Sequence, residues 1–253
     1  MKKVLKETKA AFDEHRLAFD FTIETIRAAP TIVQKNKNKS KQIQENWFPG
    51  INAVFVHIPK TAGTTTHSLL SEAEHASAKS RLPDAGTKTP NKHATALDWQ
   101  RALGEEAWQS LFSFCFVRNP WDLMVSSYLW WCQHATKFKS RRRAALQIRK
   151  KSFDHFIHSD YGRFYLNEIH GPSLSAWYSD GARDLVDYIG RFETYESDMR
   201  HILDRLGVEH GKLPIKQENS TARSAYRDYY SQSGRDIVAN RFADIIKRFD
   251  YKF

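Results

Sequence analysis

Short apolar runs alternate with helical patterns along most of this chain. The segments INAVFVHI (51–58) and SLFSFCFV (110–117) are rich in β-branched and aromatic residues, and each ends at a polar turn. Such runs are typical of buried strands. Helical patterns follow both of them, at THSLLSEAEHA (66–76) and WDLMVSSYLWW (121–131). The order strand, turn, helix therefore occurs twice.

The second half of the chain continues this alternation. A third strand is predicted at 185–192, a helix at about 195–207, and one last helix whose apolar stripe is formed by Ile237, Val238, Phe242, Ile245, Ile246 and Phe249. Strands that alternate with helices predict an α/β fold with a central parallel sheet covered on both faces. Sheets of this kind bind ligands at the carboxyl ends of their strands.

The N-terminal segment has a different character. Apolar residues at near-helical spacing predict an amphipathic helix over 4–28, and a polar run from Gln34 to Asn46 reads as a linker. A chain of 253 residues with 41% hydrophobic residues can bury one sizeable core. We therefore expect an extension at residues 1–50 and one domain at 51–253. The role of the extension and the oligomeric state are left open.

Charge and cysteine content narrow the function classes. The formal charge of +10 indicates an anionic partner such as a nucleotide, an acidic glycan, a nucleic acid or a membrane surface. Two cysteines suggest neither a disulfide framework nor a zinc site. No apolar stretch reaches the ~18 residues that span a bilayer, and no signal peptide is evident. These features predict a cytoplasmic protein, or a Golgi lumenal one if an N-terminal anchor has been removed.

The turn after the first strand has the composition of an anion-binding loop. It reads His57-Ile-Pro-Lys-Thr-Ala-Gly-Thr-Thr-Thr66, between a strand and a helix. Backbone amides at a helix N-terminus can hold a phosphate, Gly63 allows close approach, and Lys60 supplies a charge. The lysine precedes the glycine, unlike the Walker A pattern GxxxxGK[ST]. An ordinary turn with a threonine N-cap would explain the same residues.

A second candidate phosphate site follows the second strand. Arg118 ends that strand, and Ser126 lies eight residues later, about two turns into the next helix. A guanidinium with a nearby hydroxyl suits a phosphate group. The alternative is an arginine paired with a carboxylate and a serine with no ligand.

The two motifs together resemble the PAPS-dependent sulfotransferases, especially their glycan-modifying and bacterial branches; PAPS is 3′-phosphoadenosine-5′-phosphosulfate. HIPKTAGTT is similar to the family's 5′-phosphosulfate loop, and FVRNPWDLMVSSY to its 3′-phosphate motif. The resemblance covers about residues 51–253 and implies a P-loop-kinase-like α/β domain and a transfer that needs no metal. It implies donor contacts from Lys60, Thr61, Ala62, Gly63, Thr64 and Thr65 to the 5′ side, and from Arg118 and Ser126 to the 3′-phosphate.

Further roles are implied by the same resemblance. The segment NSTARSAYRDYY is similar to the family's nucleotide-covering loop, with Arg223, Ser224 and Tyr226 as candidates, although a basic surface turn fits equally. Lys60 would stabilise the donor during catalysis. We expect His93 to be the base, because a pKa near ~6.5 suits the task and similar glycan sulfotransferases place a histidine between the two motifs. The rivals for this role are His57, His67 and Glu193.

The acceptor is expected to be a hydroxyl of a carbohydrate. The loop departs from the PKSGTTW pattern of small-molecule sulfotransferases. A basic run at 137–151, with eight Lys or Arg and no acid, could attract an anionic sugar chain, and Trp130 and Trp131 could stack on sugars. Solvated charges and core tryptophans explain the same residues. Two other functions remain open: a nucleotide kinase, and a non-catalytic polyanion-binding module.

Overall fold

Two units make up the part of the chain that the structure describes. This computed structural model describes residues 46–77, 90, 92–133, 137, 142–159, 162, 173–209 and 224–253. Contacts assign residues within 37–119 and 174–223 to one unit, here the sheet unit, and residues within 120–173 and 224–253 to another, here the helical unit. The helix predicted over 4–28 lies outside the described residues.

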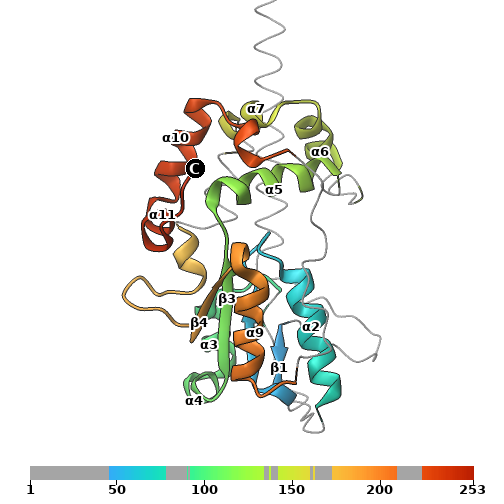
Figure 1. The fold of residues 1–253 in the computed structure, drawn as a ribbon, viewed down its shortest axis with the longest axis vertical. Coiled ribbons are helices and arrows are strands. Elements are labelled where there is room, and N and C mark those ends of the chain that lie inside the picture. Colours follow the sequence, from blue (N-terminus) through green and yellow to red (C-terminus); the bar gives the residue numbers. More distant parts are fainter. Residues whose placement is uncertain are drawn as a thin grey trace, which may run out of the picture. The chain divides into compact units, whose positions relative to one another are not determined.

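The sheet unit is built on four strands. They are β1 (Trp47–Phe48), β2 (Ala53–Val56), β3 (Phe112–Val117) and β4 (Tyr188–Arg191), in the order β1-β2-β3-β4. The pairs β2–β3 and β3–β4 are parallel, and β1 pairs with β2 in the antiparallel sense. The predicted α/β class, with a mostly parallel sheet flanked by helices, is confirmed (Figure 1).

The edge strand β1 was not predicted. Trp47 and Phe48 pair with Val54 and Ala53, and the 3-10 helix η1 (Pro49–Ile51) turns the chain from one strand into the next. Asn52 ends this turn in the left-handed conformation, at φ 52°. The sheet therefore begins within residues 1–50, directly after the segment expected as a linker, because Phe48 is buried in the core and holds the chain on the sheet.

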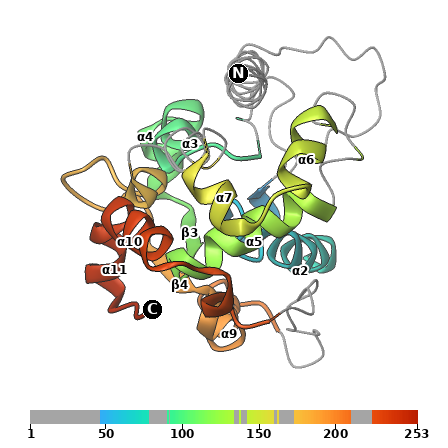
Figure 2. The same ribbon diagram turned by 90° about the horizontal axis from the view of Figure 1, so that it is seen from above.

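Helices cover both faces of the sheet. Figures 1 and 2 place α2 (Gly63–Ala76) and α9 (Tyr195–Arg205) on one face, and α3 (Ala96–Leu103) and α4 (Glu105–Gln109) on the other. Helix α3 begins with a capping box, in which Thr95 Oγ1 accepts from Asp98 N and the Asp98 carboxylate accepts from Thr95 N. Two 3-10 helices, η4 (Leu174–Trp177) and η5 (Phe192–Thr194), complete the unit.

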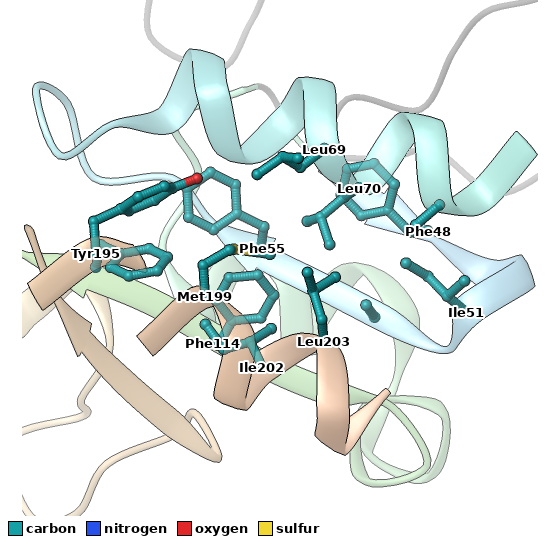
Figure 3. Close-up of a cluster of buried hydrophobic side chains, with 13 residues drawn as sticks. Phe48, Ile51, Phe55, Leu69, Leu70, Phe114, Tyr195, Met199, Ile202 and Leu203 are labelled. Carbon is teal, nitrogen blue, oxygen red and sulfur yellow. The ribbon is translucent and has the colours of Figure 1, made fainter. Parts of the chain in front are cut away.

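The main core lies between the sheet and the helices α2 and α9 (Figure 3). Alternate residues of β2 and β3 point into it, so that Phe55 and Phe114 stack at 5.3 Å. Each fully buried side chain of this size contributes roughly 1.5–3 kcal/mol. The helices supply Leu69, Leu70, Ala73, Tyr195, Met199, Ile202 and Leu203.

The helical unit contains five α-helices among its described residues. They are α5 (Pro120–Gln133), α6 (Arg142–Arg149), α7 (Phe153–His158), α10 (Gln232–Arg241) and α11 (Ala243–Phe249), with the 3-10 helix η6 (Tyr226–Tyr229). The prediction of one last helix through 237–249 is wrong. Phe242 leaves the helical conformation at φ −116° and ψ 30°, and it is fully buried. Its burial fixes the break between α10 and α11.

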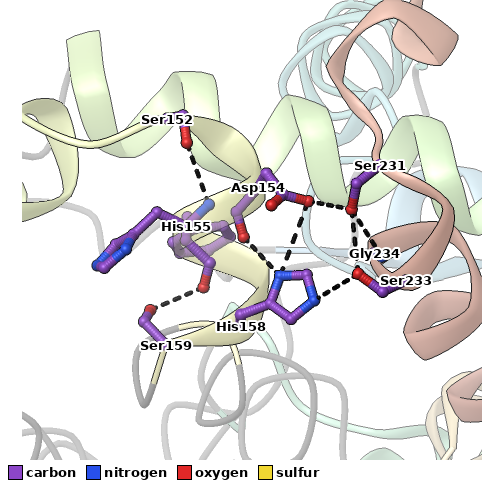
Figure 4. A network of polar contacts seen from close by, with 9 residues as sticks. Ser152, Asp154, His155, His158, Ser159, Ser231, Ser233 and Gly234 are labelled. Carbon is purple, nitrogen blue, oxygen red and sulfur yellow. Dashed lines mark hydrogen bonds and ion pairs between the residues drawn. The ribbon is translucent and has the colours of Figure 1, made fainter.

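A polar network joins α7 to α10 (Figure 4). Ser231 caps α10 by accepting from Gly234 N at 3.1 Å, and its hydroxyl donates to the Asp154 carboxylate of α7. His158 Nε2 contacts Ser233 Oγ at 3.0 Å, while His158 Nδ1 donates to the main-chain oxygen of Asp154 at 2.7 Å. The network therefore fixes two helix ends to each other.

Within the described ranges, no helix has the length and the apolar character that a membrane span requires.

Candidate active site

The two predicted anion motifs begin at neighbouring strand ends. The parallel register pairs Val56 of β2 with Cys115 of β3. The loop from His57 to Gly63 follows β2, and Arg118 follows the last residue of β3. Because parallel strands end at the same edge of a sheet, the sheet itself brings the lysine loop and the arginine together.

The loop turns through two left-handed residues. Lys60 has φ 69° and Ala62 has φ 66°, and α2 starts directly afterwards at Gly63. A left-handed residue followed by a helical one aims successive amide N–H groups into one concavity, which suits an anion. Left-handed geometry costs a non-glycine residue about 1–2 kcal/mol, so the loop holds strain of the kind found at functional sites.

The threonines of the loop differ in burial and in their hydrogen bonds. Thr61 is buried, and its hydroxyl donates to Ile58 O at 2.9 Å. Thr66 is also buried, and its hydroxyl lies 3.2 Å from both Ala62 O and the hydroxyl of Tyr195. Thr65 is buried too, whereas Thr64 is exposed. The Thr61 hydroxyl proton is thus already used, which leaves its amide as the donor for a ligand.

Gly63 is needed because His57 packs directly on its Cα. A Cβ added at Gly63 would lie 1.7 Å from His57 Nε2. No side chain fits there unless the imidazole moves. The contact with His57 therefore explains why glycine is needed at position 63. The left-handed backbone conformation is adopted by Lys60 and Ala62, and not by the glycine.

Arg118 is bound to the lysine loop. It is 7% exposed, and its Nη1 donates to Lys60 O at 2.9 Å. Its guanidinium carbon lies 3.7 Å from the ring centre of Phe192, which follows β4. The next residue, Asn119, donates its amide to the Glu193 carboxylate at 2.7 Å. Residues that follow three adjacent strands thus meet around one guanidinium.

The buried imidazole of His57 lies in positive surroundings. Burial, and then the nearby His93, Lys92, His67 and Lys60, lower its pKa to about 2. The ring is therefore neutral at physiological pH. Every charged neighbour that acts on it is basic, so this end of the sheet favours an anion.

His93 lies against His57 at the same end of the sheet. Their ring centres are 4.6 Å apart, and His93 Nδ1 is 3.1 Å from the main-chain oxygen of His57. The ring of Trp177 lies nearly perpendicular to that of His93, with 6.5 Å between the ring centres. His93 is exposed and His57 is 5% exposed, which makes His93 the one of these two that can reach an acceptor.

Comparison with known proteins decides the family. The family model described as "Sulfotransferase family" matches residues 47–252, which include all the groups described above. This chain belongs to the sulfotransferase family. An uncharacterized protein of Archaeoglobus fulgidus is 27% identical to it over 128 residues, which are 49% of this chain and 90% of that protein. The match confirms the predicted family and the predicted transferase activity.

The other predicted donor-binding residues of this sulfotransferase belong to the helical unit or are not described. Ser126 is half-buried on α5 and Ser224 is exposed. Tyr226 donates its hydroxyl to Lys252 O at 3.2 Å and packs on Phe253 at 5.9 Å. Arg223 lies outside the described residues. The roles of these four residues stay predictions.

Two of the rival bases have other contacts. His67 Nδ1 is 3.4 Å from Ser71 Oγ, and its ring meets the edge of Phe48 at 5.7 Å. Glu193 accepts from the Asn119 amide. Among the described residues, no three or more His, Cys, Asp or Glu side chains are grouped so that they could hold a metal ion. Independence from metal remains an expectation for this sulfotransferase.

Sequence reasoning missed three neighbours of the site: Phe192 beside Arg118, Trp177 beside His93, and Tyr195 beside Thr66. Phe192 was included in the predicted strand 185–192, and its place at a strand end could have marked it. Trp177 and Tyr195 carried no signal of that kind.

Proposed function

We propose that this sulfotransferase moves the sulfuryl group of PAPS to a hydroxyl of a carbohydrate. The observation that carries the proposal is the bond between Arg118 and the main chain of Lys60 at the ends of two adjacent parallel strands. It joins the two motifs that the family resemblance assigns to the two ends of one nucleotide. A turn with a structural role only would not require a buried arginine beside a strained lysine.

The donor would lie with its 5′-phosphosulfate on the loop. The amides of residues 61–65 and the ammonium of Lys60 would bind its oxygens, as amides at a helix N-terminus bind phosphate. Arg118, with Ser126, would bind the 3′-phosphate, because a guanidinium can grip phosphate oxygens bidentately. Lys60 would also neutralise the charge that develops on the departing 3′,5′-diphosphate.

His93 is proposed as the base. As the acceptor oxygen bonds to sulfur, its proton passes to His93, and the bond from sulfur to the 5′-phosphate oxygen breaks. The products are a sulfate ester and 3′-phosphoadenosine-5′-phosphate. Positioning and electrostatics carry most of the catalysis in such a transfer, as in phosphoryl transfer.

The exposed cations on and just after α6 favour an anionic sugar chain as the acceptor. The helix buries Ala144, Ala145 and Ile148, while Arg142 and Arg149 are exposed, as are Lys150 and Lys151 after its end. Exposed cations of this kind attract uronate or sulfate groups. The exposure of Trp131 is 3%, which favours the core role over sugar stacking, and Trp130 is half-buried.

Calorimetry with 3′-phosphoadenosine-5′-phosphate, without metal, tests the donor site. We expect binding by the wild type and a loss of at least about tenfold, or ~1.4 kcal/mol, in both Lys60→Ala and Arg118→Ala. Arg101→Ala, on the exposed surface of α3, is the matched control and should bind normally. No binding by the folded wild type would overturn the proposal.

Transfer from labelled PAPS to a panel of glycans tests the acceptor. Label in uronate-bearing or sulfated chains supports the proposal, and label only in phenols or in protein tyrosine refutes the carbohydrate assignment. Magnesium-dependent phosphoryl transfer from ATP would instead favour a kinase. Steeply salt-dependent polyanion binding without any nucleotide affinity would favour a binding module.

A further inference from the structure

His57 has features that the transfer mechanism leaves unexplained. Its imidazole is buried against Gly63, its ring centre is 4.6 Å from that of His93, and it stacks on Phe55 at 5.2 Å. Among the described residues, no hydrogen-bond partner lies within reach of its Nδ1. A buried imidazole without a partner at that nitrogen is costly, and a plain hydrophobic residue would avoid the cost.

We propose that His57 is the positioning residue for the base: its main-chain oxygen keeps the proton of His93 on Nδ1, and its ring sets the spacing between Gly63 and His93. This inference rests on the proposed role of His93. It adds which nitrogen of His93 reacts and what holds that ring in place.

The first step of the argument is chemical. A carbonyl oxygen only accepts hydrogen bonds, so the contact of 3.1 Å between His57 O and His93 Nδ1 requires the proton on Nδ1. In neutral His93 the lone pair is then on Nε2. Nε2 is therefore the atom that takes the acceptor proton. A main-chain acceptor of this kind commonly selects the tautomer of a functional histidine.

The second step is electrostatic. A charged ring 4.6 Å from His93 would oppose the protonation that catalysis requires. The groups that act on His57 are His93, Lys92, His67 and Lys60, and together with burial they keep its ring neutral. His57 can thus touch the base without repelling the proton that the base receives.

The third step is steric. The His57 ring fills the space over Gly63, so it links the start of α2 to the base. The loop that would bind the donor and the histidine that would activate the acceptor are then spaced by a single rigid ring. Loss of that ring should disturb the relative placement of donor and acceptor more than the affinity for either.

Nitrogen-15 NMR of the full chain tests the tautomer independently of activity. The His93 signals are assigned by their loss in His93→Asn, and long-range proton–nitrogen spectra are recorded from pH 5 to pH 8. We expect Nδ1–H in neutral His93 and no titration of His57 in this range. A neutral His93 with its proton on Nε2, the form that prevails in free histidine, would overturn the inference.

Kinetics test the spacing. His57→Ala should lower kcat at least tenfold with a smaller change in KM, and His57→Phe, which keeps a ring, should restore part of kcat. Calorimetry with 3′-phosphoadenosine-5′-phosphate checks that both variants fold and bind the donor product. His75→Ala, at an exposed histidine of α2, is the control. Equal kcat values in His57→Ala and the wild type would refute the spacing role.

The two proposals fail separately. The Nδ1–H form in a protein that transfers no sulfuryl group would refute the proposed function, and with it the role of His93 as the base, but would leave the tautomer selection by His57 O intact. Sulfuryl transfer by a protein whose His93 carries its proton on Nε2 would refute the positioning role alone.

Discussion

The guanidinium of Arg118 donates to the main-chain oxygen of Lys60, over a distance of 2.9 Å. The two residues are 58 positions apart in the chain and adjacent in the sheet unit. The contact means that the arginine supports the loop as well as offering donors to a ligand. Changes at Arg118 should therefore affect both stability and donor affinity.

Arg118→Lys should weaken binding of 3′-phosphoadenosine-5′-phosphate about tenfold or more. An ammonium cannot keep the bond to Lys60 O, the contact with Phe192 and a bidentate phosphate contact at once. Calorimetry measures the affinity. Arg101→Lys, at an exposed site, should bind as the wild type does, and an Arg118→Lys variant with full affinity would contradict the role assigned to the guanidinium.

Gly63→Ala should destabilise the fold by at least about 1–3 kcal/mol, because the new Cβ would overlap His57 Nε2. Urea unfolding measures the loss. The double variant Gly63→Ala with His57→Ala should recover much of it, since the smaller residue makes room. A Cβ added at Gly104 would have no neighbour within 4 Å. Gly104→Ala should therefore lower the free energy of unfolding only by the cost of its φ of 86°, about 1–2 kcal/mol. A double variant no more stable than Gly63→Ala would show that the ring is not the obstacle.

Ala62→Gly should keep or slightly raise stability, by up to about 1 kcal/mol. Glycine relieves the left-handed strain at φ 66° but has a more flexible unfolded chain. Ala73→Gly, at a buried position inside α2, should instead destabilise the protein. Thermal unfolding of both variants provides the comparison, and a clear loss in Ala62→Gly would argue against strain at this residue.

Acid should destabilise the protein in part through His57. Its pKa in the folded protein is about 2, below the unfolded value of 6.5. Below pH 6.5 the unfolded chain therefore binds a proton at His57 that the folded chain does not bind. The contribution of neutral His57 to stability is thus present above pH 6.5 and is lost as the pH falls. The slope from one group is at most about 1.4 kcal/mol per pH unit. Urea unfolding between pH 7 and pH 4.5 should show a shallower loss in His57→Phe than in the wild type, and identical slopes would contradict the assignment.

Asp154→Asn should lower the free energy of unfolding by about 1–3 kcal/mol. The carboxylate accepts from Ser231, which caps α10, and it lies 3.7 Å from His158 Nδ1. Asp236→Asn, at an exposed carboxylate of α10, should change stability far less. Chemical denaturation of the pair makes the test, and equal losses would mean that the network between α7 and α10 contributes little.

The sequence predicted the elements that carry a strong pattern. The strands at 51–58 and 110–117 and the helices after them are all present, because buried apolar runs and turn residues leave few alternatives. The edge strand at Trp47 was missed because a strand of two residues is too short to show the alternation of apolar and polar residues. The break at Phe242 was missed because its stripe of apolar residues is the same for one helix or for two.

The sequence indicated which residues form the site, but it indicated their contacts less well. Lys60 and Arg118 were expected after the ends of two strands, and the structure shows that these strands are adjacent and that the two residues are in contact. Gly63 was expected to make room for a ligand, yet it makes room for His57, since the partner of a glycine depends on side chains that no local pattern identifies. The capping box of Thr95 and Asp98 could have located the helix that begins just after His93.

The parallel register of β2 and β3 also bears on how such sequences can diverge. The pairing of Val56 with Cys115 sets the distance between the two motifs. This distance therefore does not depend on the number of residues that connect the motifs. Insertions or deletions between these strands can accumulate without altering that distance. Remote relatives should therefore be sought by the two short motifs with a spacer of variable length, and not by overall similarity.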